Sequence, residues 1–127
     1  MTANELSKRF LKWFQENNPE SRIFRNNAGC FKTEAGQWVR YGIPNAGGSD
    51  FIAFVPFVPV VKETCHGKCT HSFLTVQFYE IKTLKDKMSA AQIKFADLIC
   101  KMGGEYFIVK NNKDDELLFS IEKWSPK

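Results

Sequence analysis

Residues 73–109 contain the pattern that most constrains the fold of this chain. Residues 73–82 read as a largely buried β-strand, in which side chains alternate between the two faces of a sheet. Residues 89–102 then follow a helical pattern that two glycines stop, and residues 106–109 form a short apolar run. A strand, a helix and a strand of these lengths predict a right-handed crossover between two parallel strands of one sheet.

The rest of the chain supplies one more helix and further strands. Thr2 and Glu5 form a capping-box pattern ahead of an apolar stripe of helical period, which ends near Asn17. Short strands are predicted at residues 21–27, 51–55 and 117–124. Residues 37–50, rich in Gly, Pro and Asn, are predicted to form a loop. We therefore expect one α/β domain over residues 1–127, with a mixed β-sheet flanked by helices.

Composition indicates a folded protein with one core. The 127 residues include twelve Phe and three Trp, which favours one compact domain over a disordered chain. No apolar stretch reaches the roughly 18 residues that a membrane helix needs, and the four Cys are spaced irregularly, as expected of reduced thiols. We therefore expect a cytoplasmic protein without membrane contact. The formal charge of +4 is compatible with a polyanionic partner such as nucleic acid.

Two charged residues stand at the end of the strand predicted for residues 73–82. Because side chains alternate, Glu80 and Lys82 share a face with the apolar residues that precede them. An ionised group buried without a partner is costly, so such a pair requires a partner, a metal ion or water within reach. The plainer alternative is a strand that emerges into solvent and carries a surface salt bridge there.

A Gly-Gly-Ser-Asp stretch precedes the strand predicted for residues 51–55. Gly47 and Gly48 allow a tight turn that delivers Asp50 to the start of this strand. If the strand pairs as a hairpin with the one that ends in Glu80, the two carboxylates become neighbours. They repel each other unless a divalent cation lies between them. With a lysine one pleat away, this arrangement suits metal-dependent cleavage of a phosphodiester.

These residues resemble a known nuclease motif. Asp50 followed by Glu80, Ile81 and Lys82 is similar to the D…ExK motif of the PD-(D/E)XK nucleases. Three longer stretches accompany it: FRNNAG at 24–29, GIPNAGGSDFIAF at 42–54 and FYEIKTLKDKMSAAQIKFADLICKMGGEYFIV at 78–109. Together they resemble the VRR-NUC branch, whose small stand-alone members occur in phages and prophages. The resemblance leaves out only residues 56–72 and the last strand, and it implies a restriction-endonuclease-like core with the order αβββαβ.

The resemblance implies roles for single residues. Asp50 and Glu80, with the backbone carbonyl of Ile81, would bind Mg²⁺ or Mn²⁺. Lys82 would position the attacking water, and Gln92 would be a further catalytic residue from the next helix. In-line attack by that water would leave a 5′-phosphate and a 3′-hydroxyl.

Two of the matching residues have an alternative role. Gln92 lies on the apolar stripe of its helix and so faces the site, but Ser89 and Gln92 also form a capping box, and the two uses compete for the same amide. An acidic residue at the place of Glu5 joins the metal shell in many relatives, but Glu5 could simply cap the helix after Thr2.

Basic and amide residues suggest where DNA would bind. Arg25, Asn26 and Asn27 match the family's Arg-Asn segment near the scissile phosphate, where an Arg can form a bidentate contact with phosphate oxygens. Lys87 and Lys94 fall on one helix face at seven-residue spacing and could follow a DNA backbone. A solvated surface is the alternative explanation for both groups.

Residues 56–72 have no counterpart in the family pattern and are predicted to form an extended hairpin insertion. Its candidate ligands for a structural Zn²⁺ are Cys65, Cys69 and His71, with Cys30 or His66 as the fourth. The spacing differs from the usual paired CxxC motifs, and a hairpin tip with free thiols is the favoured alternative.

These observations predict a divalent-metal-dependent DNA endonuclease in a bacterium or a phage-infected host cell. The resemblance favours a structure-selective enzyme that cuts Holliday junctions or other branched DNA. A homodimer is expected because one chain holds one site and a symmetric cut of two strands needs two. The alternatives are a flap- or end-specific nuclease and a non-catalytic DNA-binding or inhibitory protein that keeps the nuclease fold.

Overall fold

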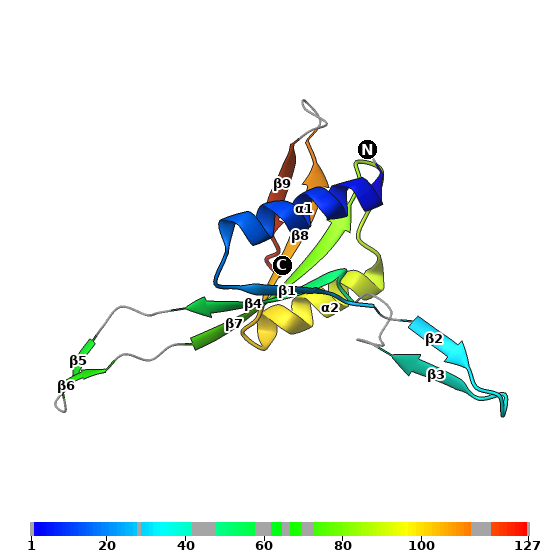
Figure 1. Ribbon diagram of the computed structural model, residues 1–127, viewed down its shortest axis with the longest axis horizontal. Coiled ribbons are helices and arrows are strands. Elements are labelled where there is room, and N and C mark those ends of the chain that lie inside the picture. Colours follow the sequence, from blue (N-terminus) through cyan, green and yellow to red (C-terminus); the bar gives the residue numbers. More distant parts are fainter. Residues whose placement is uncertain are drawn as a thin grey trace.

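A five-stranded mixed sheet forms the centre of the molecule (Figure 1). The computed structural model describes residues 2–27, 29–41, 48–57, 62–64, 67–69, 73–112 and 118–126. The strand order is β1-β4-β7-β8-β9, and in this sheet the β7–β8 pair is parallel whereas its other pairs are antiparallel. The strands are β1 (Arg22–Arg25), β4 (Phe51–Phe57), β7 (Phe73–Lys82), β8 (Glu105–Asn111) and β9 (Phe119–Lys123).

The strand-helix-strand unit predicted for residues 73–109 is present. Helix α2 (Ala90–Lys101) connects the parallel strands β7 and β8. Ser89 caps the start of α2, and Gly103 follows its end with a φ of +92°, a conformation that glycine adopts without strain. The mixed α/β fold expected from the sequence is therefore confirmed.

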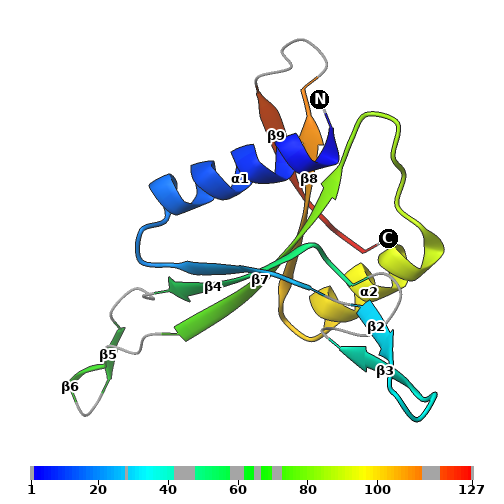
Figure 2. The same ribbon diagram turned by 45° about the vertical axis from the view of Figure 1, so that its right-hand side comes forward.

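The two helices cover opposite faces of the sheet (Figure 2). On one face, Phe10 of helix α1 (Ala3–Asn17) packs against the ring of Tyr79, with 4.8 Å between ring centroids. On the other face, α2 packs around Phe78. Because successive strand residues point to opposite faces, Glu80 lies on the α2 side together with Phe78. Within the described chain, neither helix is both long and apolar enough to cross a bilayer.

A hairpin of β2 (Gly29–Lys32) and β3 (Trp38–Tyr41) extends away from the core (Figure 1). The prediction of a loop over residues 37–50 was therefore wrong for β3. The turn is closed where the N–H of Thr33 donates to the carbonyl of Gln37 (2.7 Å), and Gly36 adopts a φ of +84°. Gly36 supplies the positive φ that this tight turn needs, a turn signal that the sequence analysis missed.

A second hairpin, of β5 (Lys62–Thr64) and β6 (Gly67–Cys69), lies within the insertion predicted for residues 56–72. Strand β4 extends two residues beyond its predicted end and includes Pro56. The pairing of β1 with β4 reaches only Phe54, so Pro56 has a paired neighbour on the β7 side alone. Proline is tolerated in a strand where its missing N–H faces an unpaired edge.

The packing around Phe10 provides a test of the core. Its side chain has no exposed surface and contacts five other aromatic rings. We expect Phe10→Ala to lower the free energy of unfolding by about 3–5 kcal/mol, because the truncation leaves a cavity between α1 and the sheet. Urea denaturation measures this change. Gln15→Ala, on the exposed side of the same helix, should change it by less than about 0.5 kcal/mol.

Candidate active site

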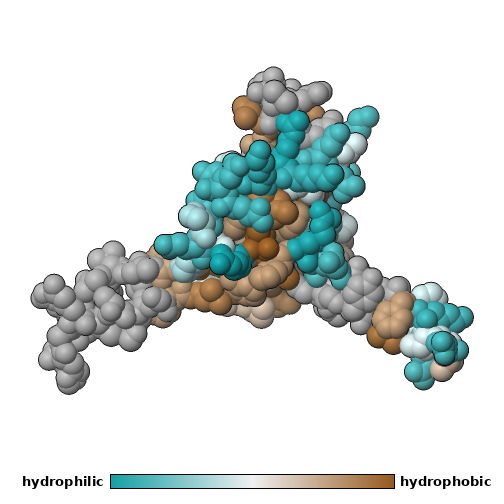
Figure 3. Space-filling view, in the orientation of Figure 1, coloured by the Kyte–Doolittle hydropathy of each residue, from teal (hydrophilic) through white to brown (hydrophobic). Residues whose placement is uncertain are grey.

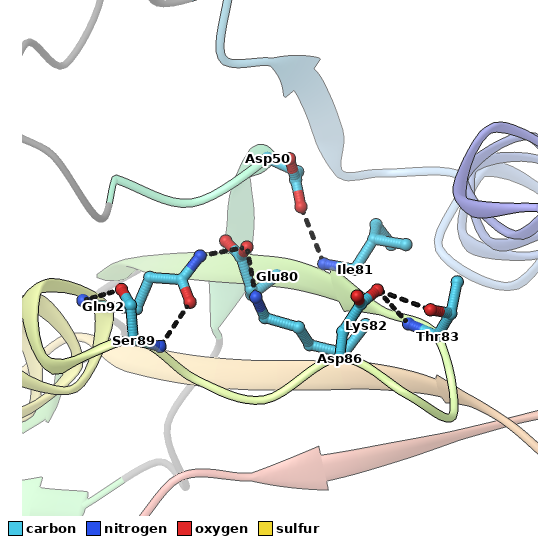
Figure 4. A network of polar contacts seen from close by, with 8 residues as sticks. All are labelled: Asp50, Glu80, Ile81, Lys82, Thr83, Asp86, Ser89 and Gln92. Atoms are coloured by element: carbon cyan, nitrogen blue, oxygen red, sulfur yellow. Dashed lines mark hydrogen bonds and ion pairs between the residues drawn. The ribbon is translucent and has the colours of Figure 1, made fainter.

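Two carboxylates meet where β4 begins and β7 ends. The antiparallel register pairs Phe51 with Tyr79, which brings the preceding residue Asp50 beside Glu80. Asp50 Oδ2 accepts a hydrogen bond of 2.8 Å from the backbone N–H of Ile81 (Figure 4). The hairpin geometry expected from the sequence therefore brings the two acidic residues together.

The backbone of Asp50 is held from the side of β1. The N–H of Asn26 donates to the carbonyl of Asp50 (2.8 Å), and the side-chain amide of Asn26 donates to the carbonyl of Ser49 (3.0 Å). Ser49 is buried, and its hydroxyl donates to the carbonyl of Phe51 (3.0 Å). These bonds fix the backbone position from which the Asp50 side chain extends. The predicted turn residue Gly47 lies outside the described residues.

Glu80 is the more buried of the two carboxylates, with 4% of its surface exposed. Its Oε1 accepts a hydrogen bond from Gln92 Nε2 (2.8 Å) and lies 3.7 Å from Lys82 Nζ. Burial, and after it the negative charge of Asp50, raises the pKa of Glu80 to about 8, against a smaller opposing effect of Lys82. The surface salt bridge that was the plainer alternative is not what the structure shows, because this ion pair is buried.

Gln92 makes both of the contacts that the sequence analysis treated as competitors. Its Oε1 accepts a hydrogen bond from the backbone N–H of Ser89 (2.9 Å), while its Nε2 donates to Glu80. The expected competition was wrong because the two ends of one amide serve different partners. The cap thereby orients the group that holds Glu80.

Tyr106 is a neighbour of the site that the sequence analysis missed. It is fully buried on β8, on the same sheet face as Glu80. Burial first, and then the charges of Glu80 and Asp50, raise the pKa of its hydroxyl. The hydroxyl has no hydrogen-bond partner of ordinary geometry among the described residues. The expected parallel pairing of residues 73–82 with residues 106–109 could have revealed Tyr106, because it places this tyrosine on a buried strand next to the one that carries Glu80.

The backbone of Ile81 is directed toward Asp50. Its N–H donates to Asp50, on the β4 side of β7. The N–H and C=O of one residue in an antiparallel pair point to the same neighbour. The carbonyl of Ile81 therefore also points to this side, which is the orientation that the expected metal ligand requires.

The donor set fits a divalent cation. Asp50, Glu80 and the carbonyl of Ile81 offer oxygen ligands, the type that Mg²⁺ and Mn²⁺ prefer. Glu80 Oε2 is buried and has no hydrogen-bond partner among the described residues, so a cation or water would satisfy it. The described part of the chain holds no group of three or more His, Cys, Asp or Glu side chains suited to a metal ion. A backbone carbonyl would have to supply the third protein ligand.

Other residues expected at the site lie at different places. Glu5 is exposed, and its carboxylate accepts a hydrogen bond of 2.8 Å from the N–H of Thr2, in the capping role; this bond lowers the pKa of Glu5. The guanidinium of Arg25 lies over the ring of Phe51, 5.2 Å from its centroid. Phe51 belongs to the core beneath α1, so Arg25 lies on the sheet face opposite Glu80. Asn27 is exposed beyond β1.

The two expected DNA-binding lysines do not share one helix face. Lys94 lies on the exposed side of α2, but Lys87 precedes the helix, which begins only at Ala90. Their shared spacing was therefore misleading, because residues 83–89 form a turn and an extended segment. DNA contacts of Arg25 and of the lysines stay predictions.

The zinc hypothesis falls mostly outside the described residues. Cys65, His66 and His71 are among the residues that the structure leaves undescribed, and only the backbone of Cys30 and Cys69 is described. Cys30 lies on β2 and Cys69 on β6, so the two belong to different hairpins.

Comparison of the chain with protein-family models and with curated proteins gave no match.

The raised pKa of Glu80 predicts how stability depends on pH without metal. Glu80 ionises less readily in the folded than in the unfolded state. Its contribution to the free energy of unfolding is therefore fully present below its ordinary pKa of 4.5 and is lost as the pH rises through its folded-state pKa of about 8. In chelator, the free energy of unfolding should therefore fall across this window. Glu80→Gln cannot ionise, so its stability should fall less and should exceed that of the unsubstituted protein at pH 9. Urea denaturation at pH 5, 7 and 9 measures both, and identical pH profiles would contradict the prediction.

Proposed function

We propose that the protein is a divalent-metal-dependent DNA endonuclease of the VRR-NUC type within the PD-(D/E)XK superfamily. The observation that carries this proposal is the convergence of Asp50, Glu80 and Lys82 at one sheet end, with an unsatisfied carboxylate oxygen in their midst. The order α1, β1, β4, β7, α2, β8 supports a restriction-endonuclease-like core of αβββαβ type, with two hairpins inserted and β9 added.

The proposed chemistry assigns a task to each side chain of the site. Asp50, Glu80 and the carbonyl of Ile81 would hold the cation, which when bound supplies Lewis-acid polarisation of the phosphoryl oxygen. Lys82 has an amine beside Glu80 that can orient a water and offset negative charge on the phosphate. Gln92 keeps Glu80 in place, which reduces the reorganisation needed during the reaction.

The decisive assay offers four-way junction, flap and linear duplex DNA to the protein, with Mg²⁺, with Mn²⁺ and with chelator. We expect cleavage of the branched substrates with either metal and none in chelator. Asp50→Ala should abolish cleavage, because it removes a metal ligand. Gln92→Ala should lower the rate about 10- to 100-fold, the usual effect of removing a residue that orients a ligand.

Glu16→Gln is a matched control, since it neutralises an exposed carboxylate on α1. Its cleavage rate should equal that of the unsubstituted protein. Cleavage that survives Asp50→Ala would refute the site. Preference for flaps or ends would favour the flap- or end-specific nuclease, and DNA binding without cleavage under any condition would favour the non-catalytic accessory protein.

An apolar surface on the α2 side of the sheet supports the homodimer that this function needs. Helix α2 packs over β7 and β8, while Phe24 of β1 and Phe54 of β4 lie side by side with half-exposed rings, 5.9 Å between centroids. Leu74 and Met102 continue this surface and line an apolar groove of about 380 Å³ between β7 and the end of α2. Figure 3 shows the apolar surface gathered over these elements.

The size of this patch suits a second copy of the chain. Leu74 and Met102 are 64% and 68% exposed, and Phe24 and Phe54 are 53% and 38% exposed. At roughly 200 Å² for a large side chain, these residues present about 400 Å² of apolar surface. A standard interface buries about 800 Å² on each partner, with an apolar centre and a polar rim. The patch would supply that centre, and a symmetric pair would carry two sites.

Leu74→Lys tests this surface. A charge buried at the centre of an interface is strongly unfavourable, so the variant should sediment as a monomer where the unsubstituted protein sediments as a dimer. Leu118→Lys, which changes a leucine of similar exposure beside β9, should leave the dimer intact. A monomeric unsubstituted protein, or loss of the dimer in both variants, would contradict the assignment of this face.

A further inference from the structure

A pocket of about 330 Å³ opens beside the acidic pair, on the far side of Lys82 from Asp50. Its floor consists of side chains on the α2 face of β7, β8 and β9, including Lys82, Ile108 and Glu122. The strand order places Asp50 next to β7 on one side and this pocket on the other. Lys82 is therefore shared by the proposed catalytic site and the pocket.

The segment that leads into α2 contributes a cation to the pocket. Lys87 and Met88 line the pocket, and Lys87 forms no ion pair among the described residues. The segment before them is held by Asp86, whose Oδ2 accepts hydrogen bonds from the N–H (3.0 Å) and the hydroxyl (2.5 Å) of Thr83. Lys110 and Lys123 also line the pocket, but each is paired with a glutamate. Lys87 is thus the cation available for an anionic ligand.

The pocket lining also carries an aromatic ring that hydrogen bonds fix in position. Trp124 donates its indole N–H to Asp97 Oδ1 of α2 (2.8 Å) and its backbone N–H to the carbonyl of Tyr106 (2.7 Å). With Met88 and Ile108, it gives the pocket an apolar lining between the charged groups. An aromatic ring beside a cation is the combination that binds a nucleobase and its phosphate in single strands.

We propose that this pocket binds one unpaired nucleotide of the DNA strand whose neighbouring phosphate meets Asp50 and Glu80. The base would lie against Trp124, and Lys87 with Lys82 would meet the phosphate. The pocket lies one to two strand spacings, roughly 5–10 Å, from the acidic pair, a distance that one or two nucleotides cover. A base stacked and paired inside a duplex cannot enter such a pocket, so the cut would fall beside unpaired DNA.

The inference rests on the proposed function, but it can be tested without cleavage. In Trp13→Phe/Trp38→Phe protein, Trp124 is the remaining indole, and its fluorescence reports on a base placed against it. We titrate this protein in chelator with a five-nucleotide oligothymidylate and with a fully paired duplex. We expect saturable quenching by the single strand, and quenching by the duplex only at much higher concentrations.

Lys87→Ala in the same background should weaken binding of the oligothymidylate roughly two- to fivefold, as expected for one exposed ionic contact. It should also reduce the slope of log K against log salt by about 0.7, the value for one phosphate contact on a single strand. Lys101→Ala, which removes the same charge at the exposed end of α2, should change neither. In cleavage assays, Lys87→Ala should raise KM and leave kcat unchanged.

Absence of quenching, or equal losses in Lys87→Ala and Lys101→Ala, would overturn the pocket assignment. Cleavage by the unsubstituted protein together with no quenching would overturn this inference alone. Quenching by the oligothymidylate without cleavage of any substrate would support the pocket and overturn the proposed nuclease activity.

Discussion

The repulsion between two carboxylates at one end of a sheet is the constraint on which the site depends. The antiparallel pairing of β4 with β7 brings Asp50 beside Glu80, although 30 positions separate them in the sequence. Burial, and after it the negative charge of Asp50, raises the pKa of Glu80 to about 8. A fold that keeps such a pair together sacrifices stability at neutral pH, a pattern typical of functional sites.

The surroundings keep this unfavourable pair in one arrangement. Asn26 holds the backbone of Asp50, Ile81 holds its carboxylate, and Gln92 holds one oxygen of Glu80. The other oxygen of Glu80 and the hydroxyl of Tyr106 lack partners among the described residues. Most buried polar groups in proteins have a hydrogen-bond partner. Two buried oxygens without one at the same place are typical of a site that binds a cation or water.

Asn26 and Lys87 show how differently the matching residues can behave once the chain folds. Asn26 was expected to contact DNA, and its described bonds hold the segment that carries Asp50. Lys87 was expected on a helix face, and it lines a pocket next to Lys82. The DNA contacts expected of both residues stay predictions. The partner that each side chain meets depends on the packing of segments that are distant in the sequence.

Local features could be predicted from the sequence: the alternation that puts Glu80 and Lys82 on one face, both capping boxes, and the strand-helix-strand order of residues 73–109. These follow from interactions among residues a few positions apart. The burial of Glu80, the neighbouring Tyr106 and the pocket beyond Lys82 follow from the packing of distant segments. Burial and electrostatics depend on which distant strands and helices surround a group, and local periodicity carries no information about those neighbours.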